Sequence, residues 1–180
     1  MQRYIDEVAY LRAFAIDPKL AIMGIGMVSN VLGIGRGAVE QRIAKGTLDA
    51  VQVGKSVHVL TCSMLDHQAA EDKMRETVLK TLKNLAKTRQ TMIYSALMAQ
   101  VGFDYRLSPH RNKIGAILGF LSEQTYAESR VLISVLVVDK KTGMPNPSFF
   151  GLLDRLTGKP HPDHEKTFSA HKQAVYKAYG

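Results

Sequence analysis

The sequence predicts a mainly α-helical protein with a small amount of β-structure, an α+β fold class. The longest helical pattern runs from Ser63 to Arg89, a stretch without Gly or Pro. Its apolar residues recur at spacings of four, four and three: Met74, Val78, Leu82 and Leu85. Two short apolar runs, at 48–59 and 131–138, instead have the length and the β-branched residues of strands.

Composition indicates an ordinary folded protein. The chain has 180 residues, of which 46% are hydrophobic and 22% are charged, enough for one large domain or two small ones. No run approaches the ~18 apolar residues that a membrane span needs, and residues 1–7 lead into no signal-peptide pattern. We therefore expect a cytoplasmic protein with no membrane partner. The single cysteine, Cys62, excludes an internal disulfide and any multi-cysteine zinc site.

The chain is basic, with 24 Lys and Arg against 16 Asp and Glu, a net charge of +8. This balance favours polyanions as partners. The excess is spread along the sequence, at +2 over residues 1–61, +2 over 62–90 and +4 over 91–180. No single tail carries it.

We expect three parts along the chain. Residues 1–61 begin with a helix over Arg3–Ala15, which Pro18 stops, and continue into a Gly-rich segment. Residues 62–90 form a connecting helix, which either pairs with a second copy as a dimerisation element or packs on its own chain. Residues 91–180 form a C-terminal α+β domain.

The segment from Met27 to Val59 has the most distinctive pattern. Three residues give one apolar face of a short helix: Val28, Val31 and Leu32. Gly33 permits the left-handed backbone that ends the helix in a tight turn, and Ile34 lies inside that turn. A second helix over Gly35–Ala44 turns Ala38, Val39 and Ile43 towards the first and Arg36, Gly37, Glu40 and Gln41 outward. Alternating residues around Gly54-Lys55 then predict a hairpin.

Residues 23–60 resemble the excisionase group of the MerR-like winged helix-turn-helix superfamily. The resemblance runs without a gap, with LGIGR at Leu32–Arg36 and KGTLDAVQVG at Lys45–Gly54. This chain departs from the family pattern at three positions, with Gly35 for Ser, Asp49 for Pro and Gln52 for Arg. The resemblance implies that double-stranded DNA is the partner, with the second helix in the major groove and the hairpin as a wing beside it.

The resemblance also assigns roles to individual residues. Base reading falls to the outward residues of the second helix: Arg36, Gly37, Glu40 and Gln41. Backbone and wing contacts fall to Gly35, Arg42, Lys45, Lys55, Ser56 and His58. Because one small winged helix makes a limited interface, we expect a homodimer. The alternative is a winged helix that docks a protein, which the loss of Arg at Gln52 favours.

The C-terminal half predicts a short helix over Met92–Val101, a longer one ending near Ser129, and a strand over Val131–Val138. The segment MPNPSFF predicts an edge strand or an extended return, and two further helices follow. This outline suits a second winged helix or, equally, an effector or oligomerisation domain that takes a protein partner. A second DNA surface would comprise Arg106, His110, Arg111, Lys113, Lys140 and Lys141.

Catalytic motifs are absent from the sequence. Histidines and acids gather in GKPHPDHEKTFSAH, which includes His161, His164 and His171, but their spacing matches no strong zinc motif and is commoner in a polar loop before a helix. No phosphate-binding glycine loop or nucleophile motif occurs. We therefore predict no enzyme, no metal and no cofactor.

Three functional hypotheses follow. The first is a sequence-specific, dimeric DNA-binding protein that acts as a transcriptional regulator or as an accessory factor of a plasmid or phage, the mobile-element part resting on the resemblance alone. The second is an architectural excisionase- or partition-like factor that bends DNA. The third is a protein-docking adaptor whose C-terminal domain carries the activity.

Overall fold

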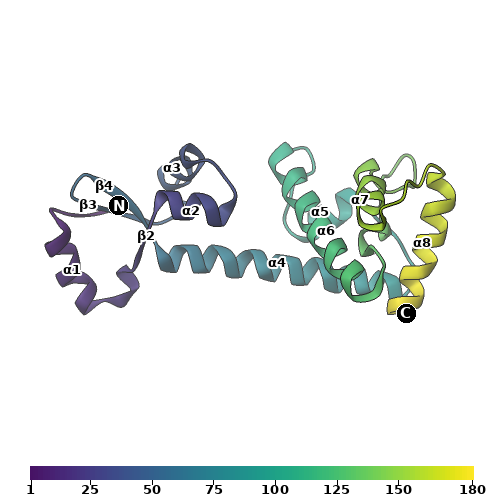
Figure 1. Ribbon diagram of the computed structural model, residues 1–180, viewed down its shortest axis with the longest axis horizontal. Helices are drawn as coiled ribbons and strands as arrows, with labels where there is room; N and C mark the ends of the chain where they lie inside the picture. The colour runs from purple at the N-terminus through teal and green to yellow at the C-terminus, as the bar shows by residue number, and fades with distance from the viewer. The chain divides into compact units, whose positions relative to one another are not determined.

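The computed structural model describes all residues 1–180 and divides the chain into two units, Met1–Asp72 and Lys73–Gly180 (Figure 1). The protein is mainly helical with two small sheets, which confirms the predicted fold class. The division falls inside α4 (Thr61–Lys87), so the expected connecting segment belongs partly to each unit.

A four-stranded sheet with strand order β1–β3–β4–β2 lies at the centre of the first unit. β3 (Ala50–Val53) and β4 (Ser56–Leu60) form the expected antiparallel hairpin, because Gly54 adopts the positive φ of 55° that its two-residue turn requires. β2 (Ile22–Gly24) pairs antiparallel with β4. Residues just before Asp6 form the fourth strand, β1 (Gln2–Tyr4), which pairs parallel with β3.

The leading helix is shorter than predicted. The prediction of a helix over Arg3–Ala15 is wrong at its start, because the first residues hydrogen bond along β3. α1 (Glu7–Ile16) begins at Asp6, whose carboxylate accepts a hydrogen bond from the Ala9 amide. It lies on the other side of the sheet from α2 and α3 (Figure 1), and none of its residues is fully buried.

Two short helices cover the remaining face of the sheet. α2 (Ile25–Leu32) ends at Gly33 with a φ of 62°, as predicted, and α3 (Arg36–Ala44) begins at Gly35. The hydroxyl of Ser29 donates to the Ile34 carbonyl and helps to close the turn between them. The core of the unit lies between these helices, the sheet and the start of α4, and its buried residues are Val28, Val39, Leu48, Val59 and Met64.

The second unit is a helical cluster with one large core. It comprises the second part of α4, then α5 (Tyr94–Gln100), α6 (Ser108–Ser129), α7 (Pro147–Thr157) and α8 (His164–Tyr179). The apolar stripe of α4 packs into this core, through Val78, Leu82 and Leu85. The chain therefore uses that stripe internally, in agreement with the second of the two interpretations of the connecting helix.

The run at 131–138 is not the continuous strand that its β-branched residues predicted. It forms a 3-10 helix over Ile133–Leu136 and a two-residue strand, β6 (Val137–Val138). Side chains from other helices accept hydrogen bonds from its backbone amides. Leu132 N–H donates to His171 Nε2 at 2.7 Å, Ile133 N–H to Thr125 Oγ1 at 3.2 Å, and Ser134 N–H to Ser122 Oγ at 3.3 Å. Local amides held in this way cannot join a ladder.

No second wing forms in the second unit. β6 pairs parallel with β5 (Met92–Ile93), and no antiparallel strand returns beside it. The MPNPSFF segment, predicted as extended, instead enters α7 at Pro147, where the fixed φ of proline suits the first turn and Asn146 accepts a hydrogen bond from the Ser148 amide. The second unit therefore lacks the antiparallel wing that its order of predicted helices and strands suggested.

Candidate nucleic-acid interface

α3 presents one buried and one exposed side. Val39 is 0% exposed and anchors the helix to the core, and Ile43 packs against the same cluster. The four residues predicted to point outward are all exposed: Arg36, Gly37, Glu40 and Gln41. Two apolar predictions are wrong in detail, because Ala38 and Val31 are exposed rather than packed between the helices.

The first turn of α3 lacks a side-chain cap. Gly35 occupies the N-cap position, where the resemblance expects Ser, and no side chain accepts a hydrogen bond from the first turn. The amides at a helix N-terminus carry partial positive charge and bind anions such as phosphate. This turn therefore combines open backbone donors with the guanidinium of Arg36.

Arg36 lies back across α2. Its Nη2 atom would be 3.2 Å from a Cβ built on Gly26, in the first turn of α2. The side chain passes close to the backbone of Gly26 and remains exposed to solvent. Sequence reasoning missed Gly26, because the predicted segment begins at Met27 and only the structure places Gly26 inside a helix.

The hairpin tip carries Lys55 and Ser56, and both are exposed as predicted. Gln52, which stands where the resemblance expects Arg, donates from Nε2 to the Gly54 carbonyl at 3.0 Å. It therefore supports the turn instead of offering a positive charge. Lys45, at the end of α3, is also exposed.

Two residues expected to contact DNA face elsewhere. Arg42 is half-buried, with Nη1 at 3.4 Å from His67 Nε2 on α4, so it joins α3 to α4. His58 lies in the middle of the sheet, where it pairs with Val51 on β3 and with Gly24 on β2. Directly paired residues share a face, and Val51 is outside the α2–α3 core, so His58 points to the side away from α3.

Three members of the predicted second DNA surface have partners within the protein: Arg106, His110 and Arg111. Arg111 donates to the carbonyls of Tyr105 and Arg106 at 2.7 and 2.9 Å, and His110 Nδ1 accepts from the Asp104 amide at 3.0 Å. These side chains fasten the loop between α5 and α6. The other members are Arg106, paired with Asp104 at 3.4 Å, the half-buried Lys113, and the exposed Lys140 and Lys141 in the turn after β6.

The three histidines of the GKPHPDHEKTFSAH segment also contact separate partners. His161 Nδ1 lies 2.6 Å from Asp154 Oδ1, and His164 stacks on Phe150 at 3.9 Å between ring centroids. His171 accepts from the Leu132 amide, and burial, with the nearby His161, lowers its pKa to about 4. The structure gathers no group of three His, Cys, Asp or Glu side chains that could hold a metal ion.

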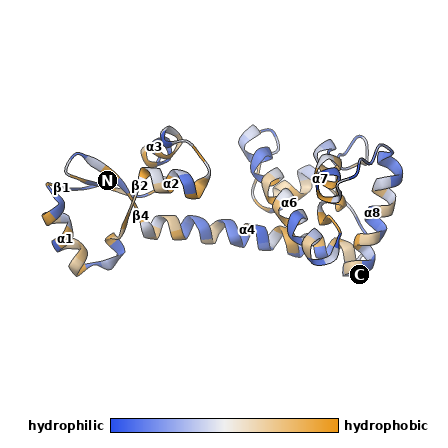
Figure 2. Cartoon of the chain, viewed as in Figure 1, coloured by the Kyte–Doolittle hydropathy of each residue, from blue (hydrophilic) through white to orange (hydrophobic).

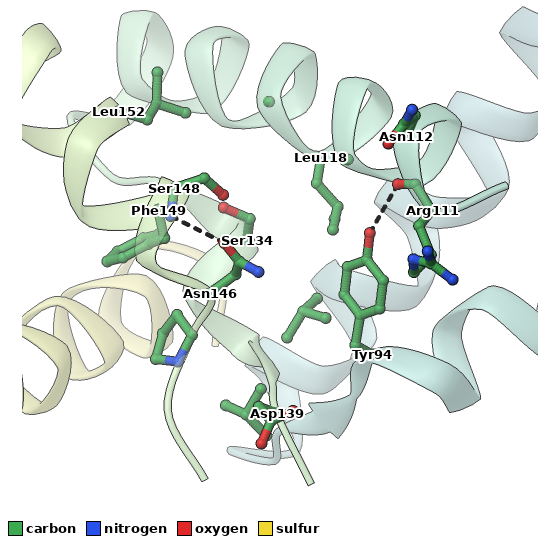
Figure 3. Close-up of a pocket in the computed structure, with 15 residues that line it drawn as sticks. Tyr94, Arg111, Asn112, Leu118, Ser134, Asp139, Asn146, Ser148, Phe149 and Leu152 are labelled. Atoms are coloured by element: carbon green, nitrogen blue, oxygen red, sulfur yellow. Dashed lines mark hydrogen bonds between the residues drawn. The ribbon is translucent and has the colours of Figure 1, made fainter. Parts of the chain in front are cut away.

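A cavity of about 730 Å³ lies in the second unit between α6 and the start of α7 (Figure 3). The Asn112 and Asn146 carboxamides and the Ser134 and Ser148 hydroxyls line it (Figure 3). Its charged side chains are bonded elsewhere, since Asp139 accepts from the Thr142 and Lys141 amides, which hold its pKa below the usual range. The sequence signal for this cavity is two glycines one turn apart in α6, at 115 and 119.

No protein-family model, curated protein or solved structure matches this chain. No helix is both long enough and apolar enough to span a membrane.

Proposed function

We propose that the first unit is a winged helix-turn-helix that binds double-stranded DNA and inserts α3 into the major groove. The observation that carries this proposal is the two-sided character of α3. Val39 fixes one side in the core, while Arg36, Glu40 and Gln41 are exposed on the other. Arg can bond a guanine edge with two hydrogen bonds, Gln an adenine edge, and Glu the amino group of cytosine.

Phosphate contacts would come from the ends of the same elements. The uncapped first turn of α3 offers amide donors, and Lys45 and the hairpin residues Lys55 and Ser56 offer side chains. Arg42 and His58 are not part of this interface, because Arg42 contacts His67 on α4 and His58 points to the face of the sheet away from α3. The contact set is therefore smaller than the one that the sequence predicts.

The biological role rests on the resemblance to excisionases. We propose a cytoplasmic regulator or accessory factor of a plasmid or phage that binds as a dimer, since one small DNA-binding module covers only about 600 to 1,000 Å². The apolar stripe of α4 is already packed in the second unit, so a dimer needs another surface. Light scattering with and without DNA measures the stoichiometry.

Selection from a random duplex library, followed by gel shift at several salt concentrations, tests the proposal. Sequence-specific binding yields a discrete site, with a repeat or palindrome for a dimer, and an affinity that falls as salt rises. Strong bending with weak sequence preference would favour the architectural alternative. No saturable binding to any duplex would refute DNA binding.

The cavity of the second unit favours a second candidate function, capture of a ligand by an adaptor. Its volume of about 730 Å³ lies within the range of small-molecule sites. The polar groups that are not committed elsewhere are neutral, so a neutral ligand with several hydrogen-bonding groups suits it. A thermal-shift screen of neutral metabolites, repeated with Gly119→Leu to fill the cavity, tests this function.

A further inference from the structure

The outward side of α4 in the second unit carries a regular row of polar residues. Val78, Leu82 and Leu85 face the core. On the opposite side, exposed residues recur at spacings of four, three, four and three: Lys73, Thr77, Lys80, Asn84 and Lys87. Figure 2 shows hydrophilic turns recurring along this helix. With a rise of 1.5 Å per residue, successive lysines of this row lie about 10.5 Å apart along the axis.

These three lysines are available to a partner. None of Lys73, Lys80 and Lys87 forms an ion pair in the structure, and each is exposed. Lys83 differs, because it is half-buried and its ammonium lies 5.3 Å from the centre of the Tyr179 ring. Glu76 is the one acidic residue between positions 73 and 89, where six are basic.

Positive charge is concentrated in the second unit. The first unit, with the candidate reading helix, has seven Lys and Arg against eight Asp and Glu. The second unit has 17 against eight, so it accounts for the whole net charge of the protein. Sequence-independent affinity for DNA comes from contacts between cations and phosphates. The first unit alone has no excess of positive charge to provide that affinity.

We propose that the lysine row of α4, formed by Lys73, Lys80 and Lys87, binds the phosphate backbone of duplex DNA without regard to sequence. The choice of duplex DNA as the polyanion rests on the function proposed above. The two units then divide the work, with base reading by α3 and phosphate affinity by the row. A helix face that is merely solvated would contribute nothing to the salt dependence of binding.

Fluorescence anisotropy on a labelled random-sequence duplex tests this division. The full chain is compared with the triple variant K73Q/K80Q/K87Q and with the matched control K159Q/K166Q/K177Q, which removes three other exposed lysines of the same unit. Circular dichroism melts check that both remain folded. The row variant should lower the slope of log affinity against log salt by about 2.7, because each phosphate contact contributes about 0.9.

Raising the salt from about 50 to 200 mM lowers the affinity of the unmodified protein by a certain factor. With a slope reduced by about 2.7, that factor is roughly 40 times smaller for the row variant. The control should keep most of the original slope. Equal reductions in both triple variants would overturn the proposal, because the overall charge of the unit would then determine the slope. No reduction in the row variant would also overturn it, because the row would then make no phosphate contacts.

The outcome is separable from the function proposed for α3. The affinity of Arg36→Ala is measured for a selected site and for the random duplex, and the ratio of the two affinities reports sequence preference. If the row variant lowers the slope while Arg36→Ala leaves preference unchanged, the row stands and the α3 assignment fails. If Arg36→Ala abolishes the sequence preference and the row variant keeps the full slope, the α3 assignment stands and the row proposal fails. No binding to either duplex defeats both.

Discussion

The guanidinium of Arg36 lies against Gly26, so closely that a methyl group there would be 3.2 Å from Nη2. This contact links the first turn of α2 to the first turn of α3. A glycine inside a helix costs up to about 1 kcal/mol of stability relative to alanine. At this position the bare backbone leaves room for the side chain that the proposed function places on a base edge.

Gly26→Ala should separate stability from DNA binding. The helix gains up to about 1 kcal/mol in free energy of unfolding, while the guanidinium of Arg36 must move by a few tenths of an ångström. We expect a higher melting temperature together with weaker binding to the selected site. Gly119→Ala is the control, because a Cβ there meets nothing within 4 Å and should leave binding unaffected. Unchanged affinity for Gly26→Ala would show that the position of Arg36 is unimportant.

Arg36→Ala and Lys55→Ala should behave differently. Loss of a bidentate contact costs about 1 to 3 kcal/mol and relaxes the preference at one base pair. Loss of a phosphate contact at the hairpin tip weakens all sequences alike and lowers the salt slope by about 1. Competition binding with a set of singly mutated sites measures both effects. Identical profiles for the two variants would refute the separate roles.

His58→Ala should leave DNA affinity unchanged, since His58 faces away from α3 in the centre of the sheet. Ser56→Ala, at the exposed hairpin tip two residues before, is the comparison and should weaken binding slightly. Gel shift on the selected site suffices. A larger loss for His58→Ala than for Ser56→Ala, in protein with an unchanged melting temperature, would contradict the placement of the wing.

Acid should destabilise the second unit through His171. Its pKa is about 4 when folded and 6.5 when unfolded, so the unfolded chain binds more protons between these values. Stability is therefore fully present above pH 6.5 and falls as the pH drops towards 4, by on the order of 3 kcal/mol in total. His171→Gln, which keeps an acceptor for the Leu132 amide, should flatten this dependence. Urea melts between pH 7 and 5 compare the two, and parallel curves would exclude His171 as the cause.

Thr125→Val should destabilise the second unit by about 1 to 3 kcal/mol, because it leaves the buried Ile133 amide without its acceptor. Thr91→Val, at an exposed position, is the control. Chemical denaturation measures both. Equal stability of the two variants would mean that the 3-10 segment does not depend on side-chain acceptors.

Local rules recovered most of the first unit. The glycine at 33 and the Gly54-Lys55 turn identified the two helices and the hairpin, because positive φ restricts the choice of residue so strongly. The outward side of α3 followed from the position of Val39. β1 could not be foreseen, since its three residues gain strand structure only from pairing with β3, far along the chain.

The second unit was harder for the opposite reason. Side chains distant in sequence, among them Thr125 and His171, hold the amides of the apolar run at 131–138. No local pattern records such partners, so β-branched residues predicted a strand and a second wing. The directions of Arg42 and His58 likewise depended on which neighbour each element packs against.

Photo-cross-linking tests the central claim most directly. A benzophenone amino acid is placed at Gln41 on the exposed side of α3 and, separately, at Val8, which is exposed on α1 across the sheet. With the selected duplex, the account predicts strong cross-linking from position 41 and little from position 8. Cross-linking from position 8 alone, or equally from both, would contradict insertion of α3 into the groove.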